Sequence, residues 1–115
     1  IQTKLEKVIS YTKQTMVAYL GEEDLNRLCT YVAEYSIGDT LQKISPVKVD
    51  PQLKSIDIIH FGWNIGKAFD RKRIHTATFI KNVFAHTLSD LKISTIERKM
   101  SHTESECRIK LDRNI

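Results

Sequence analysis

The stretch from residue 53 to residue 69 constrains the fold most, because its apolar side chains would surround a helix on all sides. Two sets of residues fall on different sides: Ile56, Ile59 and Trp63, and Ile58, Phe61, Ile65 and Phe69. A helix that is apolar all round has to be buried. The sequence therefore predicts a central core helix here, with Asp50 as its N-cap and Pro51 as its first residue.

Two glycines in this stretch, Gly62 and Gly66, are four residues apart and fall on one face of the expected helix. They would allow another helix to approach closely, although this spacing has clear force only in membranes. No apolar run in the sequence approaches the roughly 20 residues that span a bilayer. We therefore expect no membrane association.

Amphipathic patterns before the core helix predict two more helices. Residues 4–20 repeat apolar side chains at three- and four-residue steps and stop at Gly21; a short strand over residues 15–20 is the alternative. The next helix begins with three acidic residues, 22–24, which suit a helix N-terminus. Gly38 is expected to follow its last turn in a left-handed conformation.

The second half of the chain predicts two helices after the core helix. One runs over residues 73–87, and the other begins at Thr95, where Ser94 and Glu97 have the spacing of a capping box. Residues 103–111 fit either a continued helix or an alternating strand over residues 107–111, and both stay open.

With only 4 Gly and 2 Pro, a turn-dense β-sandwich is disfavoured. We predict a single all-α domain of about five helices, with a minor C-terminal strand as an open option. Residues 1–38 would form a helical hairpin, residues 39–50 a connector, and residues 51–115 a basic three-helix bundle resembling a helix-turn-helix.

The net charge of +4 is distributed unevenly. Residues 1–57 hold 7 Lys/Arg and 8 Asp/Glu, a net of −1, whereas residues 58–115 hold 11 and 6, a net of +5. The densest cluster is Arg71, Lys72 and Arg73, supported by Lys67, Lys81, Lys92, Arg98 and Lys99. Such asymmetry is typical of a surface that faces a polyanion, and equally of a solvated helical face.

Catalytic and metal-binding motifs are absent from the sequence: there is no P-loop, no nucleophile elbow and no zinc-protease motif. Its four histidines and two cysteines lack metal-ligand spacing. We expect no enzyme activity, catalytic residue, metal, cofactor or small-molecule substrate. His60 is expected to be a hydrogen-bonded core histidine, within reach of Asp57 one turn earlier.

Cys29 and Cys107 are far apart and are expected to be reduced thiols. No basic, apolar and small-residue sequence typical of a secretory signal is visible. Both features lead us to expect a cytoplasmic protein.

Three helices with a basic last one favour DNA binding. Arg98 and Lys99 would contact bases or phosphates, and Thr95 would bind phosphate at a helix N-terminus. Arg71, Lys72 and Arg73 would hold the DNA backbone. The segment between the last two helices, residues 88–94, is longer than a compact turn. The alternative is a helical module for protein–protein interaction or self-association, and Trp63 and the tyrosines are expected to pack rather than stack on bases.

Several segments resemble a known family. An extended piece at residues 47–49 is followed by residues 54–61 (KSIDIIHF), 79–84 (FIKNVF) and 95–99 (TIERK). In this order they resemble the C-terminal part of RteC-type regulators of conjugative transposons. The resemblance covers about residues 48–103 and implies a helical, two-part regulatory protein of a mobile element with a DNA-binding end.

Overall fold

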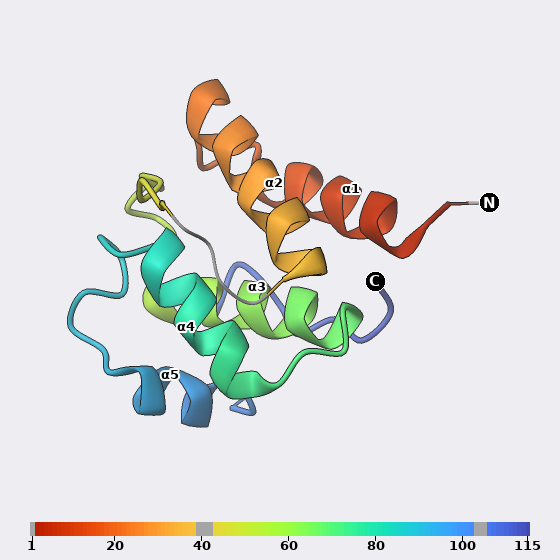
Figure 1. Cartoon of the computed structure of the whole chain (residues 1–115). Helices are drawn as coiled ribbons and strands as arrows, with labels where there is room; N and C mark the ends of the chain where they lie inside the picture. Colours follow the sequence, from red (N-terminus) through yellow and green to blue (C-terminus); the bar gives the residue numbers. More distant parts are fainter. Residues whose placement is uncertain (1, 39–42, 103–105) are drawn as a thin grey trace.

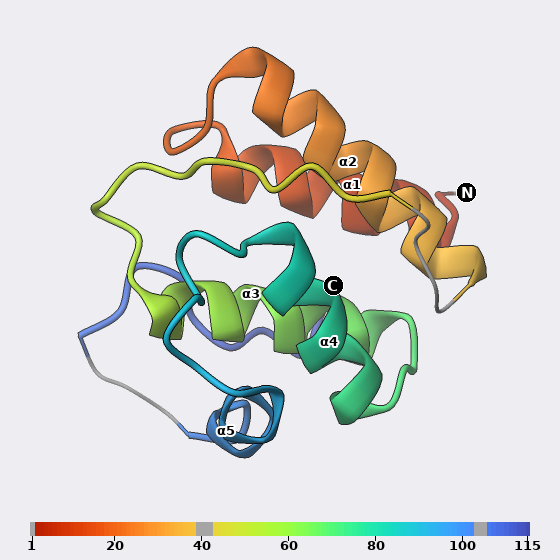
Figure 2. The same ribbon diagram turned by 60° about the vertical axis from the view of Figure 1, so that its left-hand side comes forward.

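The computed structural model describes residues 2–38, 43–102 and 106–115. It contains five helices: α1 (Lys4–Met16), α2 (Glu22–Ile37), α3 (Ser55–Ala68), α4 (Arg73–Val83) and α5 (Ile93–Lys99). No strand occurs in these ranges, so the all-α class with about five helices is confirmed. Figures 1 and 2 show α1 and α2 side by side on one side of α3, with α4 and α5 on another.

Helix α3 is the central core helix that its composition predicts. Ile58, Ile59, Phe61 and Ile65 are completely buried in it. Its predicted start is wrong, however, because Asp50 forms a turn of its own instead of capping the helix. Its side-chain Oδ1 accepts from the Gln52 N–H at 2.8 Å, its carbonyl accepts from Leu53, and the helix begins at Ser55. This turn buries the Leu53 side chain before the helix starts.

The two glycines of α3 allow close packing of α4, as their spacing predicts. A Cβ atom on Gly62 would lie 2.7 Å from Cδ1 of Ile80. One on Gly66 would lie 2.4 Å from Oγ1 of Thr76. Real Cβ atoms are not found at such distances, so a side chain at either position would require α4 or the facing side chain to move.

The helical hairpin differs from its prediction at two places. Helix α1 ends at Met16, and residues 17–20 form a turn, so neither the longer helix nor the strand over residues 15–20 is right. Gly38 does cap α2, but with φ −162° its backbone is extended and not left-handed. The chain therefore leaves α2 in a direction that any residue could adopt.

The connector contacts both halves of the chain. The Val47 N–H donates to the carbonyl of Val83 at the end of α4, at 2.9 Å. The Asp50 N–H donates to the carbonyl of Tyr19, which follows α1, at 2.8 Å. Val47 is completely buried, so residues 43–50 contribute to the core.

The sequence pattern allowed either a helix or a strand in the C-terminal segment, but residues 106–115 form neither. It is irregular and is held by three buried polar side chains spaced along α3: Asp57, His60 and Asn64. Asn64 donates to the Lys110 carbonyl at 2.8 Å and accepts from the Asp112 N–H at 2.7 Å. Residues 103–105, where the predicted pattern begins, lie outside the described residues.

His60 is a hydrogen-bonded core histidine, as expected. Its Nδ1 lies 2.8 Å from the Ile109 carbonyl oxygen, and its Nε2 lies 3.0 Å from that of His102. Asp57 also binds the tail, through the backbone N–H groups of Arg108 and Ile109. Asp57, His60 and Asn64 form a polar stripe along α3. Their side chains bind backbone groups of the tail that would pair with a neighbouring strand in a sheet.

Across the described ranges, none of the helices has the length and apolar character needed to cross a membrane.

Candidate nucleic-acid interface

Arg73 connects the two basic clusters that the sequence singles out. It is the first residue of α4 and is exposed. Its Nη2 donates to the carbonyl oxygen of Glu97 in the last turn of α5, at 2.7 Å. That turn carries Arg98, which is exposed, and Lys99, which is half-buried. Arg73, Arg98 and Lys99 therefore lie on adjoining parts of one surface.

Arg71 lies only two residues earlier but points to a different element. Its Nη2 donates to the Tyr35 carbonyl at 2.8 Å, and its guanidinium lies 5.2 Å from the centroid of the Tyr35 ring. Tyr35 is in the last turns of α2, where backbone carbonyls attract cations. Arg71 therefore caps α2, and the structure separates it from Arg73.

Lys81 is also engaged within the fold. Its Nζ donates to the backbone carbonyls of Leu88 and Leu91, in the segment between α4 and α5. It is half-buried and stabilises that connection. It therefore contributes less to a surface charge than the sequence alone indicates.

Helix α5 begins at Ile93, two residues before the predicted start. The predicted capping box is wrong, since Lys92 is the N-cap and makes no side-chain capping hydrogen bond. An earlier start places Ile93, Ile96 and Met100 on one face, and the last two are completely buried. Thr95 is thus half-buried inside the helix, so the expected phosphate site at a Thr95 N-terminus is not present.

The connection between the last two helices is longer than a helix-turn-helix turn. Helix α4 ends at Val83, four residues before the predicted 87, and residues 84–92 lead to α5. A compact helix-turn-helix needs three or four residues there. The three helices α3, α4 and α5 do pack on one another, but α5 has only 7 residues.

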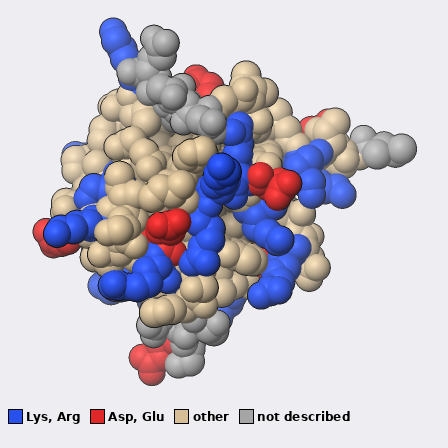
Figure 3. Space-filling view, turned by 60° about the horizontal axis from the view of Figure 1, so that its bottom comes forward, with Lys and Arg blue, Asp and Glu red and all other residues tan. Residues whose placement is uncertain are grey.

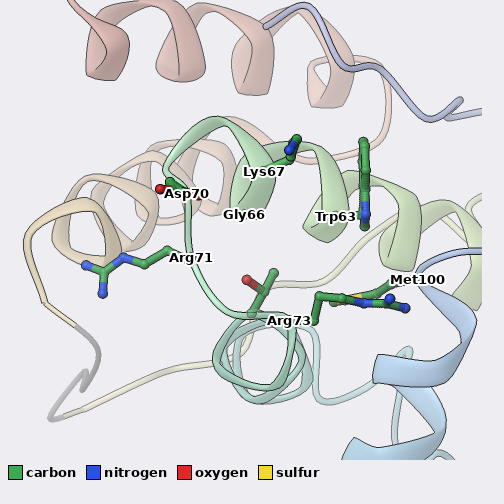
Figure 4. Close-up of a pocket in the computed structure, with 8 residues that line it drawn as sticks. Trp63, Gly66, Lys67, Asp70, Arg71, Arg73 and Met100 are labelled. Atoms are coloured by element: carbon green, nitrogen blue, oxygen red, sulfur yellow. The ribbon is translucent and has the colours of Figure 1, made fainter.

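A hollow of about 270 Å³ lies beside Arg73, between α3, the start of α4 and the end of α5. Its lining contains three cations, one carboxylate and two large apolar side chains: Lys67, Arg71, Arg73, Asp70, Trp63 and Met100, with Gly66 and Thr76. In Figure 4, Arg73 extends toward Met100 below Trp63, whereas Arg71 points to the opposite side. Basic and aromatic groups therefore meet at the Arg73 end of the hollow.

Two residues of this region, Trp63 and Arg113, carry no signal in the sequence that marks them as site residues. The Arg113 guanidinium lies 5.7 Å from the centroid of the half-buried Trp63 ring. Arg113 is in the irregular tail, whose path depends on the polar stripe of α3, so no local pattern could have indicated this pair. For Trp63 the sequence predicts packing alone.

We use the term basic face for Lys67, Lys72, Arg73, Arg98 and Lys99. The first four of these side chains are exposed. Figure 3 views the side on which α5 lies in Figure 1, and Lys and Arg side chains are prominent there, interrupted by single acidic residues. On this side of the molecule, Lys and Arg therefore cover more of the surface than Asp and Glu.

The pKa of the Cys29 thiol, on α2, is shifted away from the range of a reactive cysteine. Burial raises the pKa of the Cys29 thiol, with a smaller opposing effect of Lys13, so Cys29 is not an activated nucleophile. Neither Cys29 nor Cys107 forms a disulfide within the part of the chain that the structure describes. Within the described ranges, no three His, Cys, Asp or Glu side chains are grouped in a way that could hold a metal ion.

Comparison with known proteins gave no match: no family model, no curated protein and no solved structure is significantly similar to this chain.

Proposed function

We propose that this chain is a DNA-binding domain that contacts the phosphate backbone through its basic face. The observation that carries the proposal is the hydrogen bond from Arg73 to the Glu97 carbonyl, because it joins the start of α4 to the basic last turn of α5. This contact brings the basic residues of α4 and α5 onto adjoining parts of one surface, and we propose that they contact phosphates of the same duplex.

The physical basis is the release of counterions. Each Lys or Arg that neutralises a phosphate frees a condensed cation, so affinity falls as salt rises. Within the basic face, the exposed Lys72 and Arg98 are suited to this role, and Lys99 adds charge from the same turn as Arg98. The short α5 and the long connection before it argue for contacts with the backbone rather than for deep insertion of a recognition helix.

A regulatory role, and a setting on a mobile element, are part of this proposal through the resemblance to RteC-type regulators alone. Regulation would require preference for a particular DNA sequence. Competition between unrelated duplexes of equal length is the measurement that reveals such a preference.

The first test removes the two basic residues at the end of α5. We expect the double variant Arg98→Ala, Lys99→Ala to bind a fluorescein-labelled duplex at least tenfold more weakly in low salt, measured by anisotropy. The slope of log affinity against log salt should fall by about one for each phosphate that is no longer neutralised, about two in total.

The matched control is Lys7→Ala, Lys13→Ala on α1, which removes the same charge from exposed positions of the other half. Its affinity and salt slope should stay close to those of the unchanged chain. Equal losses of affinity in both double variants would mean that only net charge matters. Unchanged binding in the α5 variant would exclude the basic face, and absence of any DNA binding would favour the protein-interaction alternative.

A further inference from the structure

We infer that the hollow beside Trp63 binds a single unstacked nucleotide, with its base against the indole and its phosphate held by Lys67 and Arg73. This inference rests on the proposed function and specifies its ligand as single-stranded or locally unpaired nucleic acid. It differs from duplex backbone contact because it requires an exposed base.

The size of the hollow limits what it can hold. Its volume of about 270 Å³ is slightly below the roughly 300–1,000 Å³ of pockets for drug-sized ligands. The half-buried Trp63 provides apolar surface, whereas Met100 borders the hollow but is completely buried, and Gly66 adds no side chain to the lining. One planar ring system with an attached charged group suits this combination of space and chemistry.

The cations are placed to bind the charged group. Lys67 follows Trp63 by four residues on α3, so both are on one face of the helix. Lys67 is exposed and makes no hydrogen bond or ion pair with any residue in the described ranges. The hydrogen bond from Arg73 to Glu97 uses one Nη2 donor, and a guanidinium has five N–H donors in all.

The Trp63 ring already has a planar cation over it. The Arg113 guanidinium lies 5.7 Å from the ring centroid, and a guanidinium stacks on aromatic faces much as a base does. Arg113 is exposed and does not line the hollow, so a base that enters the hollow does not need to displace it. Asp70 in the lining opposes an anion, so its charge should weaken binding.

The experiment uses the natural fluorescence of the chain, which contains a single tryptophan. Emission from Trp63 reports on this site alone and is followed during titration with AMP, with a dT oligonucleotide and with inorganic phosphate at constant ionic strength. We expect saturable quenching by AMP and, at lower concentration, by the oligonucleotide. Phosphate alone should leave the emission unchanged.

Four variants separate the roles of the lining residues. Lys67→Ala should weaken oligonucleotide binding about tenfold, as expected for loss of a charge-assisted contact, and Asp70→Asn should strengthen it. Lys13→Ala on α1 is the matched control and should have no effect. In an anisotropy assay, Trp63→Phe should keep most of the affinity, whereas Trp63→Leu should lose it while circular dichroism confirms an intact fold.

Several results would overturn this inference: no quenching by AMP or the oligonucleotide, equal quenching by phosphate, or full affinity in Trp63→Leu. Failure here is distinct from failure of the proposed function. If the chain binds a duplex in a salt-sensitive way but Trp63 emission does not change, the basic face is supported and the nucleotide site is excluded. If AMP quenches Trp63 emission but the chain does not bind a duplex, the nucleotide site is supported and the basic face is excluded as a DNA interface.

Discussion

At the scale of single residues, the Asp57 carboxylate depends strongly on hydrogen-bond partners, because the residue is only 1% exposed. It accepts backbone N–H groups from Lys54 at 2.8 Å, Arg108 at 2.6 Å and Ile109 at 3.1 Å. A buried charge is tolerable when hydrogen bonds surround it in this way. Asp57 therefore fixes both the start of α3 and the course of the tail.

Replacing Asp57 with Asn tests this double role. An amide keeps one acceptor oxygen but presents an NH₂ group to backbone donors, so at least one N–H is left unpaired. We expect Asp57→Asn to lower the free energy of unfolding by about 3 kcal/mol, measured by urea denaturation. Asp90→Asn, at an exposed position, is the control and should change it by less than about 0.5 kcal/mol.

A pH effect is expected from Tyr11. Burial raises the pKa of its phenol, and the hydrogen bond from Asn64 to the phenol oxygen opposes this to a smaller extent. The folded state therefore favours the neutral phenol of Tyr11. The contribution of this phenol to the free energy of unfolding is complete below its ordinary pKa of 10.0. It is lost as pH rises above that value, because the phenol then ionises more readily in the unfolded chain.

Urea denaturation at several alkaline pH values measures this effect. The unchanged chain should lose stability more steeply above about pH 10 than Tyr11→Phe, which has no phenol to ionise. Parallel pH profiles for the two chains would show that Tyr11 ionises equally well in the folded and unfolded states.

At the scale of elements, the contact between α3 and α4 sets the geometry of the candidate interface. Thr76 fills the space beside Gly66, and its Oγ1 is 2.7 Å from the Tyr35 hydroxyl of α2. Helix α4 begins three residues before Thr76, at Arg73. The close approach at Gly66 thus determines where Arg73 meets α5.

Gly66→Ala should therefore be costly. The new Cβ would lie 2.4 Å from Thr76 Oγ1, and α4 or the Thr76 side chain would have to move. We expect a loss of about 2 kcal/mol in the free energy of unfolding. Gly38→Ala is the control, since a Cβ there meets nothing within 4 Å and the backbone is extended; a similar loss in both variants would contradict the packing argument.

At the scale of the whole molecule, the sequence predicts the helices better than their junctions. Apolar periodicity is sufficient for the buried α3 and for the order of five helices, because burial depends on side chains within one element. The tail could not be predicted, since its conformation depends on Asp57, His60 and Asn64, which are distant in sequence. Arg71 and Arg73 are arginines of the same short basic run, so the sequence does not distinguish them. In the structure, Arg71 donates a hydrogen bond to α2 and Arg73 donates one to α5.

The most direct test of the account is a map of the DNA contact on the whole chain. In ¹⁵N NMR spectra, a short duplex added at low salt should shift the backbone signals of residues 67, 72, 73, 98 and 99, and these shifts should reverse when salt is raised. Signals of α1 and of residues 22–34 in α2 should remain in place. Shifts confined to the helical hairpin, or none at DNA concentrations that saturate binding, would contradict the claim that the basic face is the interface.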